Sequence, residues 1–387
     1  MNEEAIAASV LAAAEAREPL LVQGRGSKLG MLRPVQAARS LSTRDLTGIT
    51  LYAPQELIIS ARAGTTLPEL EARLSASGQH LIAEPPDLSG LLGDGVQTIG
   101  GVVATNLSGP RRVAWGAMRD HVMGVRAVNG RGEVIRSGGR VLKNVTGLDL
   151  CKLLTGSHGT LAVLTEITLK VLPAPELTGS LVVPAPDAAR GVALLSAALG
   201  SPYGVSAAAY LPAEAAERVP ELAGRGAVAV VRIEDFAKSV AYRLGRLAEE
   251  LGGEIVDDPA SKAAWRAIRD VVPLRTEPGD AVWRLSVRPT SGPAALAAVE
   301  AAGCRGFLDW GGGLVWVAGL PGLHDAVIAA ARTSGGTWTV LRAPDAMRAA
   351  VDVVPPEPEP LARITRRVKA ALDPHGILNP GRVYAGL

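Results

Sequence analysis

The sequence predicts an α+β protein of two or three domains. Its 387 residues exceed what one small core usually organises. Short apolar strands and amphipathic helices are interspersed along most of the chain. Glycine-rich loops adjoin several of the strands expected in the first half. With 48% hydrophobic and 20% charged residues, the composition is that of a folded globular protein.

The first part of the chain predicts a domain over residues 1–173. Helices are expected over Glu3–Ala16 and Leu67–Ser77, and strands over Leu20–Gln23, Leu57–Ala63, Val122–Asn129, Gly132–Arg136 and Leu161–Leu172. Asn129–Gly130 indicates a hairpin turn between two of these strands. The Pro173–Pro175 segment indicates a domain boundary.

The rest of the chain predicts a smaller α+β, ferredoxin-like domain over residues 174–343, followed by a C-terminal segment over 344–387. We expect the helices of the smaller domain to lie on one face of its sheet. Its expected strands are Ser180–Val183, Ala227–Ile233, Ala281–Val287, Leu314–Gly319 and Thr337–Leu341, and its expected helices are Ala188–Leu199, Ala237–Leu251, Ala294–Ala302 and His324–Arg332. A last helix is expected over Leu361–Leu372, and we find no repeat at a fixed period.

Composition narrows the possible functions. A formal net charge of +2 and 3% aromatic residues argue against binding of nucleic acid. Two isolated cysteines, Cys151 and Cys304, are too few for an iron–sulfur cluster, and we expect buried thiols in a cytoplasmic chain. No apolar run reaches the roughly 18–20 residues that span a bilayer. Any association with a membrane is therefore expected to come through partners.

Four glycine-rich loops favour a binding site for a phosphate-bearing ligand. They are Gly24–Gly30, Thr98–Pro110, Trp115–Gly124 and Lys143–Glu166. Glycines let backbone N–H groups approach a pyrophosphate, and a helix N-terminus adds a favourable dipole. The first loop fits neither a Walker loop, since Leu29 follows Lys28, nor the spacing of a Rossmann fingerprint. Ordinary turns remain the alternative for each loop taken alone.

Together these loops resemble the FAD-binding domain of the vanillyl-alcohol-oxidase (PCMH) type. The resemblance covers about residues 18–173, and its motifs are Thr98–Gly109 (TIGGVVATNLSG), Arg119–Asp120, Gly147–Leu161, Ala61–Leu70 and Glu84–Pro86. It implies two α+β subdomains in the FAD-binding domain and a C-terminal segment that returns to that domain. The short second domain and the Leu378–Arg382 tail further resemble the FAD-binding subunits of bacterial glycolate oxidases.

The resemblance implies roles for residues in six segments. They are Gly24, Arg25, Gly26, Ser27 and Lys28 in the first pyrophosphate loop, Thr98, Ile99, Gly100 and Gly101 in the second phosphate-facing turn, Thr105, Asn106, Ser108 and Gly109 on the flavin side, Arg119, Asp120 and Val122 along the cofactor, Gly156, Gly159 and Ile167 near the adenine, and Asn379 where the tail returns. Some members of the family tether FAD through a residue of the first loop. This loop has neither His nor Cys, which implies non-covalent FAD.

The same resemblance implies a function and partners. The expected function is a part in the oxidation of glycolate, a small 2-hydroxy acid, to glyoxylate. A larger FAD-containing glycolate oxidase subunit and an iron–sulfur subunit are the implied partners, with peripheral attachment to the inner membrane through the complex. The alternatives are a stand-alone D-lactate or 2-hydroxy-acid dehydrogenase and a non-catalytic assembly subunit.

Catalytic residues are not assigned by these patterns. Larger related dehydrogenases carry a histidine-rich metal motif, but the corresponding Phe307–Trp316 stretch has no histidine, so no metal site is predicted. His121 and His158 are candidate bases. Arg284 and Arg288 would face the same side of a strand and are candidates for holding a carboxylate. Structural or solvent-facing roles are the alternative for each of these four residues.

Overall fold

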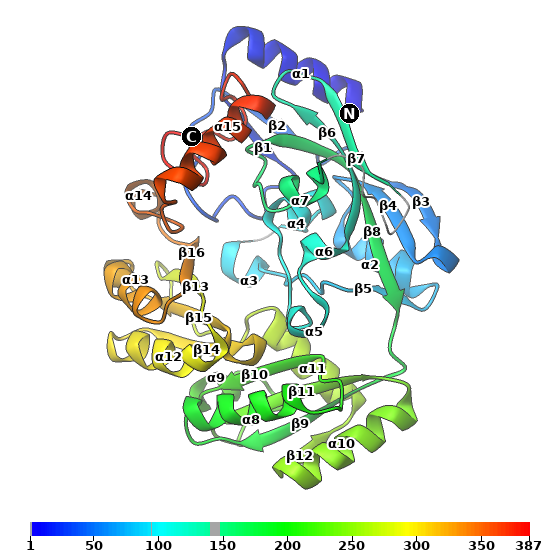
Figure 1. Cartoon of the computed structure of the whole chain (residues 1–387), viewed down its shortest axis with the longest axis vertical. Coiled ribbons are helices and arrows are strands. Elements are labelled where there is room, and N and C mark those ends of the chain that lie inside the picture. The colour runs from blue at the N-terminus through cyan, green and yellow to red at the C-terminus, as the bar shows by residue number, and fades with distance from the viewer. Residues whose placement is uncertain (1, 94, 140–147) are drawn as a thin grey trace.

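Two β-sheets organise the chain in the computed structural model, which describes residues 2–93, 95–139 and 148–387. A six-stranded sheet belongs to the first part of the chain and an eight-stranded sheet to the second, and they occupy opposite ends of the molecule (Figure 1). This arrangement confirms the predicted α+β fold. The start of the fourth glycine-rich loop, including Lys143 and Gly147, lies outside the described residues.

The six-stranded sheet is antiparallel and has the order β3-β4-β8-β6-β7, with β5 also paired to β8. A separate parallel pair, β1-β2, lies near the N-terminal helix. The elements of this part are α1 (Glu3–Ala16), β1 (Leu20–Gln23), β2 (Arg39–Ser42), β3 (Ile49–Ala53), β4 (Ile58–Arg62), α2 (Leu67–Ser75), β5 (Gln79–Leu81), α3 (Ser89–Leu92), α4 (Ile99–Thr105), α5 (Arg112–Trp115), α6 (Met118–His121), β6 (Val122–Asn129), β7 (Val134–Gly138), α7 (Leu150–Leu154) and β8 (Ala162–Pro173).

Local chemistry explains where these elements begin and end. Thr66 caps α2 by accepting a hydrogen bond from the Glu69 N–H, and the helix buries Leu67, Leu70 and Leu74 on one face. The hairpin between β6 and β7 is longer than the Asn129–Gly130 turn that was predicted. The Asn129 side chain accepts from the Glu133 N–H at 3.0 Å, which delays the second strand to Val134.

The eight-stranded sheet contains the same topology twice. Its order is β12-β9-β11-β10-β14-β15-β13-β16, so the two halves are βαββαβ units with the strand order of a ferredoxin-like fold. The halves meet where β10 pairs β14. The elements are β9 (Leu177–Pro184), α8 (Ala188–Gly200), β10 (Ala207–Leu211), α9 (Ala213–Glu217), β11 (Val228–Asp235), α10 (Ala237–Leu251), β12 (Glu254–Val256), α11 (Asp258–Arg269), β13 (Ala281–Ser286), α12 (Gly292–Ala301), β14 (Arg305–Asp309), β15 (Leu314–Gly319), α13 (His324–Thr333) and β16 (Thr337–Arg342). The repeat is one of topology, without a fixed sequence period.

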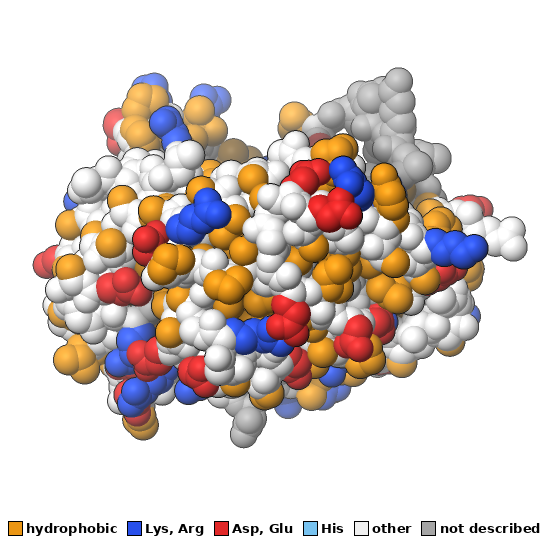
Figure 2. Space-filling view, turned by 90° about the horizontal axis from the view of Figure 1, so that it is seen from below, with side chains coloured by type: hydrophobic (Ala, Val, Ile, Leu, Met, Phe, Trp, Pro, Cys, Tyr) orange, Lys and Arg blue, Asp and Glu red, His pale blue; other side chains and the backbone are white. Residues whose placement is uncertain are grey.

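The prediction that all helices lie on one face of this sheet is wrong for α11. Gly179 on β9 faces Leu244 of α10, whereas the next residue, Ser180, bonds Ser261 of α11 at 2.7 Å. Successive residues of a strand point to opposite faces. Helix α11 is therefore inserted between the sheet and the first part of the chain, while α10 faces outward. On the end of the molecule that carries the eight-stranded sheet, acidic, basic and hydrophobic side chains are interspersed (Figure 2).

The C-terminal segment returns to the first part of the chain, as predicted. It contains α14 (Asp345–Ala350) and α15 (Glu359–Leu372), and Figure 1 shows α15 beside β1 and β2. The Leu20 N–H donates to Ile377 O at 2.7 Å. Buried Lys369 donates to Asp373, to Thr160 O and to Leu378 O. All three ammonium donors are thus used to fix the tail.

Candidate functional site

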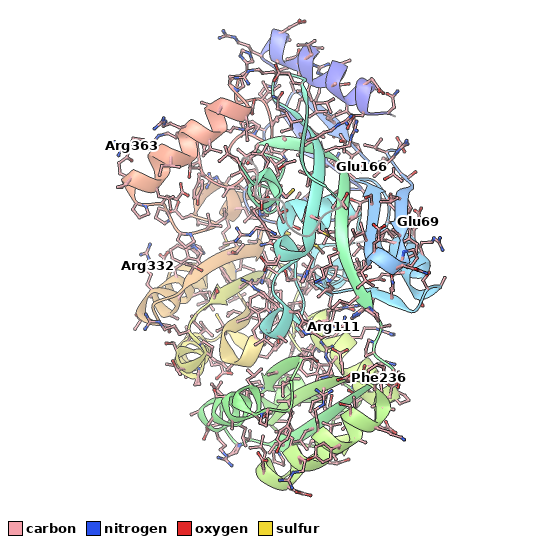
Figure 3. All side chains as sticks on the ribbon, turned by 45° about the vertical axis from the view of Figure 1, so that its right-hand side comes forward. Glu69, Arg111, Glu166, Phe236, Arg332 and Arg363 are labelled. Carbon is pink, nitrogen blue, oxygen red and sulfur yellow. The ribbon has the colours of Figure 1, made fainter. Side chains whose placement is uncertain are left out.

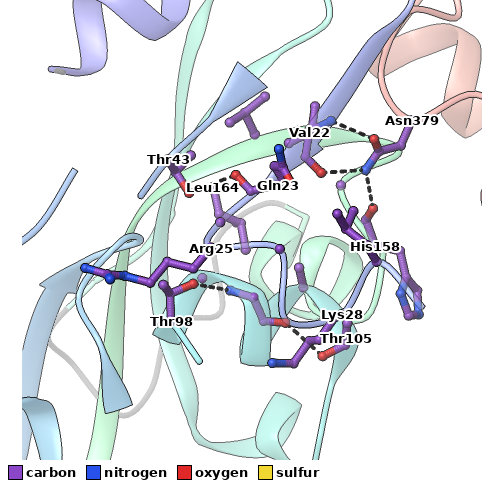
Figure 4. Close-up of a pocket in the computed structure, with 18 of the residues that line it drawn as sticks. Val22, Gln23, Arg25, Lys28, Thr43, Thr98, Thr105, His158, Leu164 and Asn379 are labelled. Carbon is purple, nitrogen blue, oxygen red and sulfur yellow. Dashed lines mark hydrogen bonds between the residues drawn. The ribbon is translucent and has the colours of Figure 1, made fainter. Parts of the chain in front are cut away.

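A cleft opens where the first glycine loop, α4, the residues before β8 and the C-terminal tail meet (Figure 4). Its empty volume, solvent at the mouth included, is about 740 Å³. Eleven of the predicted FAD-binding residues line it: Gly24, Arg25, Gly26, Ser27, Lys28, Thr98, Gly100, Gly101, Thr105, Gly159 and Asn379. Segments distant in sequence therefore converge on one cleft.

Close backbone packing explains the glycines on both sides of the cleft. A Cβ on Gly24 would lie 2.6 Å from Thr98 Oγ1, the group that caps α4 by accepting from the Gly101 N–H. A Cβ on Gly100 would lie 2.7 Å from that of Ala63, so Gly100 is required for packing. A Cβ on Gly101 would instead lie 3.9 Å from Lys28 Nζ. Gly101 is thus the position where an added side chain occupies the cleft.

Lys28 supplies a cation whose protonation is tuned by its surroundings. Its ammonium donates to Gln97 Oε1 at 2.7 Å. Burial lowers the pKa of Lys28 to about 8, with Asp87 opposing this shift. The backbone around Lys28 is held by Arg382, whose guanidinium donates to Lys28 O at 2.7 Å and to Arg33 O at 2.9 Å. Sequence reasoning missed Arg382, which comes from the far end of the chain.

Asn379 lines the cleft wall, but its amide is engaged by the protein. Its Oδ1 accepts from the Val22 N–H at 2.7 Å, and its Nδ2 donates to Val22 O at 3.1 Å and to His158 O at 2.8 Å. Figure 4 shows these three bonds between the tail, β1 and the loop before β8. Asn379 therefore positions the wall of the cleft. Burial and the nearby charge of Arg382 lower the pKa of His158 to about 3, so that its imidazole is neutral at neutral pH.

The other predicted residues lie outside the cleft lining. Asn106 Oδ1 accepts from the Arg119 N–H, Ser108 Oγ from the Met118 N–H, and an Asp120 oxygen from the Ala117 N–H. Gly156 donates its N–H to Val103 O. Ile99, Val122 and Ile167 are buried in the core, and Gly109 packs against Glu84 O. For these nine residues (Ile99, Asn106, Ser108, Gly109, Arg119, Asp120, Val122, Gly156 and Ile167), contact with FAD stays a prediction.

A second group of charged residues lies between the two sheets. Arg232 donates to both carboxylate oxygens of Glu84 at 2.9 Å, and Arg111 donates to Glu234 at 2.7 and 3.0 Å. Figure 3 shows Arg111 at the junction between the upper part and the lower sheet. Burial opposes charge on Glu84 and Glu234, but the two guanidinium groups outweigh it and hold the pKa of both carboxyls below its usual range. We call these four residues the charge quartet.

The described residues contain no group of three or more His, Cys, Asp and Glu able to hold a metal ion. In the stretch compared with the metal motif, Asp309 is buried and accepts a bond from the Trp310 N–H. Cys151 and Cys304 are free and buried. Among helices of the described residues, none is long and apolar enough to cross a membrane.

Comparison with known proteins follows the same division of the chain. Residues 1–138 match the FAD binding domain family, and residues 357–383 match the C-terminal domain of FAD linked oxidases. The matched segments contain the first loop, α4 and the returning tail, which all line the cleft. The Lys28 ammonium, which lies next to Gly101 in the cleft lining, is a donor that fits an anionic dinucleotide.

Several known proteins are similar in sequence or in fold. The glycolate oxidase subunit GlcE of Escherichia coli is 36% identical over 96% of this chain and 94% of its own length. A D-lactate dehydrogenase of Archaeoglobus fulgidus is 34% identical over 48% of this chain and 40% of its own, and the glycolate oxidase subunit GlcD of Bacillus subtilis is 31% identical over 45% and 36%. The structure of an alkyldihydroxyacetonephosphate synthase shares the fold, with a TM-score of 0.66 at 17% identity, over 98% of this chain and 75% of that one. Because similarity to GlcE extends over nearly the whole length of both proteins, the chain belongs to the FAD-linked oxidases, a family of FAD-dependent oxidoreductases.

Proposed function

We propose that this chain is the FAD-binding subunit of a complex that oxidises glycolate to glyoxylate. The observation that carries the proposal is the cleft itself, in which glycine loops, Lys28 and the returning tail converge. Similarity to GlcE over 96% of the chain supports the choice of glycolate. The proposed division is an FAD-binding domain over residues 1–173, a smaller domain over 174–343 and a returning segment over 344–387.

The cleft residues suggest how FAD would be held. Backbone N–H groups around Gly24–Ser27 and the Lys28 ammonium would bind the pyrophosphate without a covalent tether. Arg382 and Asn379 would keep the two walls at a fixed separation, because their polar groups are committed to backbone partners. FAD, when bound, supplies the acceptor for two electrons.

The proposed partners are a larger FAD-containing glycolate oxidase subunit and an iron–sulfur subunit. Similarity to GlcE and to GlcD supports a complex of several subunits. The two cysteines of this chain are too few to hold an iron–sulfur cluster, so onward transfer of electrons to such a cluster requires another chain. The proposed location is the cytoplasm, at the inner membrane through these partners.

A second candidate is a stand-alone D-lactate or 2-hydroxy-acid dehydrogenase. Similarity to a D-lactate dehydrogenase supports it, but that similarity covers 48% of this chain.

Purification of the full chain, alone and from its native cell, tests the proposal. We expect a flavin spectrum, co-purifying chains that include an iron–sulfur protein, and glycolate-dependent dye reduction by the complex but not by the chain alone. A colourless chain that does not take up added FAD would contradict the proposed cofactor. Dye reduction with D-lactate by the chain alone would favour the second candidate.

A further inference from the structure

Arg284 presents a cation whose hydrogen-bonding capacity is not used by the described residues. It lies on β13, directly opposite Trp316 of β15. Its Nε atom is buried and has no hydrogen-bond partner among residues 2–93, 95–139 and 148–387. Burial and the nearby charge of Arg112 lower the pKa of Arg284 to about 10, so that it remains a cation at neutral pH. A buried donor without a partner is unfavourable, and an anionic ligand would relieve it.

Two tryptophans surround this guanidinium. Arg284 Cζ lies 5.1 Å from the ring centroid of Trp316 and 5.3 Å from that of Trp310. The Arg112 guanidinium of α5 lies 4.3 Å from the Trp310 centroid. Such cation–π contacts orient a guanidinium while leaving its N–H groups free for an in-plane acceptor.

A buried carboxyl group adjoins the same place. Asp309 lies two residues from Phe307, which is paired with Trp316 across the strands and stacks on it at 6.4 Å. Gly306, which precedes Phe307, faces Leu296 of α12, so Phe307 and Asp309 face away from that helix. Burial raises the pKa of Asp309 to about 7. A carboxyl group in this state can both donate and accept a hydrogen bond.

These residues of the second sheet contact the first part of the chain. Trp310 Nε1 donates to Gly109 O at 3.1 Å. Gly109 ends the segment that resembles the flavin side of the FAD-binding family. The bond from Trp310 therefore joins this group to the segment for which contact with the flavin is predicted. We call Arg112, Arg284, Asp309, Trp310 and Trp316 the Arg284 cluster.

We propose that the Arg284 cluster binds a small 2-hydroxy acid, with its carboxylate on the Arg284 guanidinium and its hydroxyl against Asp309. This inference rests on the proposed function and adds to it the residues that recognise the substrate. A guanidinium matches a carboxylate through two parallel hydrogen bonds. The tryptophans favour a short chain, because they occupy the space beside the cation. Arg288, the other arginine considered for this role, is exposed beyond the end of β13.

Calorimetric titration of the full chain with oxalate and with glycolate tests the proposal. Oxalate is a useful probe because it carries carboxylates and cannot be oxidised to an aldehyde acid. We expect saturable binding to the unmodified chain and at least about a tenfold higher Kd for Arg284→Met, since a charge-assisted hydrogen bond is lost. Arg288→Met is the matched control and should bind both acids like the unmodified chain. Arg284→Lys keeps the positive charge but loses the two parallel N–H donors of the guanidinium, so it should also bind both acids more weakly. This variant keeps the proposal testable if Arg284→Met does not fold.

The substitution Asp309→Asn tests the recognition of the ligand's hydroxyl group independently of the recognition of its carboxylate. Glycolate should bind the unmodified chain more tightly than acetate, and the substitution should reduce that preference while acetate binding is kept. Equal binding of oxalate by the unmodified chain and both Arg284 variants, or no binding at all, would overturn the proposal. Flavin absorbance of the same samples reports separately on the proposed function. A yellow chain that ignores these acids contradicts the Arg284 cluster alone, whereas a colourless chain that binds them through Arg284 contradicts the proposed cofactor alone.

Discussion

The cleft between the first glycine loop and α4 differs from the junction between the two sheets in how its charged groups are positioned. In the cleft, short loops supply backbone groups, and the cation Lys28 lies within the first loop itself. At the junction, the charge quartet is assembled from residues 84, 111, 232 and 234. The first arrangement depends on glycine spacing, whereas the second depends on where the sheets come to lie. The difference predicts that substitutions at the junction affect stability most, and that those in the cleft affect cofactor binding.

Arg232→Met should have the largest effect on stability. It leaves Glu84 without its bidentate partner in a buried setting, which costs about 3–5 kcal/mol. Urea unfolding followed by circular dichroism measures the loss. Arg225→Met, which breaks an exposed pair with Glu254, is the matched control and should cost less than about 1 kcal/mol. Equal effects of the two substitutions would show that the quartet does not hold the sheets together.

The free energy of unfolding should fall at acid pH, because the junction contains two buried carboxylates. The pKa values of Glu84 and Glu234 are lowered in the folded chain. Their contribution to stability is therefore complete above the unfolded value of about 4.3 and is lost as the pH falls below it. Unfolding free energies measured between neutral pH and pH 3 should decline less steeply in Arg232→Met. A parallel decline in both proteins would contradict this account.

Asn379→Ala should have an intermediate effect on stability and also weaken FAD binding. It removes three bonds to Val22 and His158, and we expect a loss of roughly 2–3 kcal/mol. Asn379→Asp keeps the acceptor for the Val22 N–H and loses both donors. The aspartate variant should therefore also lose stability, as read from its thermal midpoint. Unchanged midpoints in both variants would exclude the proposed role of Asn379 as a clamp.

The smallest expected effect is the dependence of FAD affinity on pH through the ammonium of Lys28. Because its pKa in the free chain is about 8, the ammonium is lost as the pH rises through that value, and attraction for the pyrophosphate falls with it. The Kd for FAD should rise by up to about tenfold per pH unit above 8. Lys28→Met should bind FAD more weakly and lose this dependence. Fluorescence titration of FAD between pH 7 and 9 checks both, and a steep rise retained by Lys28→Met would assign the titration to another group.

Local patterns were enough to predict much of the fold. The bounds of α1, β1, β6, α10 and β15 agree with the ranges expected from periodicity. Strand β10, Ala207–Leu211, was missed because three alanines carry little strand preference. Helix α11 was missed, and with it the helix layer between the sheets. The spacing of its buried residues, Ser261, Ala264, Trp265 and Ile268, is a local helical pattern that was overlooked, whereas its position against β9 depends on contacts that no local pattern specifies.

The candidate site likewise contains residues that local patterns predict and residues that they do not. The glycines of the first loop and of α4 were predicted because close backbone approach leaves a trace in sequence. Arg382 was missed, since its position depends on the returning tail. His158 was considered only as a candidate base, and its place in the cleft lining is fixed by the bond from Asn379. Asn379 lines the cleft, but its bonds are to the protein backbone, and its contact with FAD stays a prediction. The charge quartet could not be predicted as a group, because its two bidentate pairs, Arg232–Glu84 and Arg111–Glu234, each join residues more than a hundred positions apart in sequence.

The central claim is that FAD binds in the cleft between the first loop and α4, and Gly101→Val tests it most directly. The Cβ would meet only Thr98 and Lys28 at ordinary contact distances, so the fold should persist while the branched side chain fills the cleft. Gly322→Val, at a position with open space around it, is the control. Flavin absorbance of the purified proteins should be normal in the control and fall at least about tenfold in Gly101→Val. Normal flavin content in folded Gly101→Val protein would contradict this position of the cofactor.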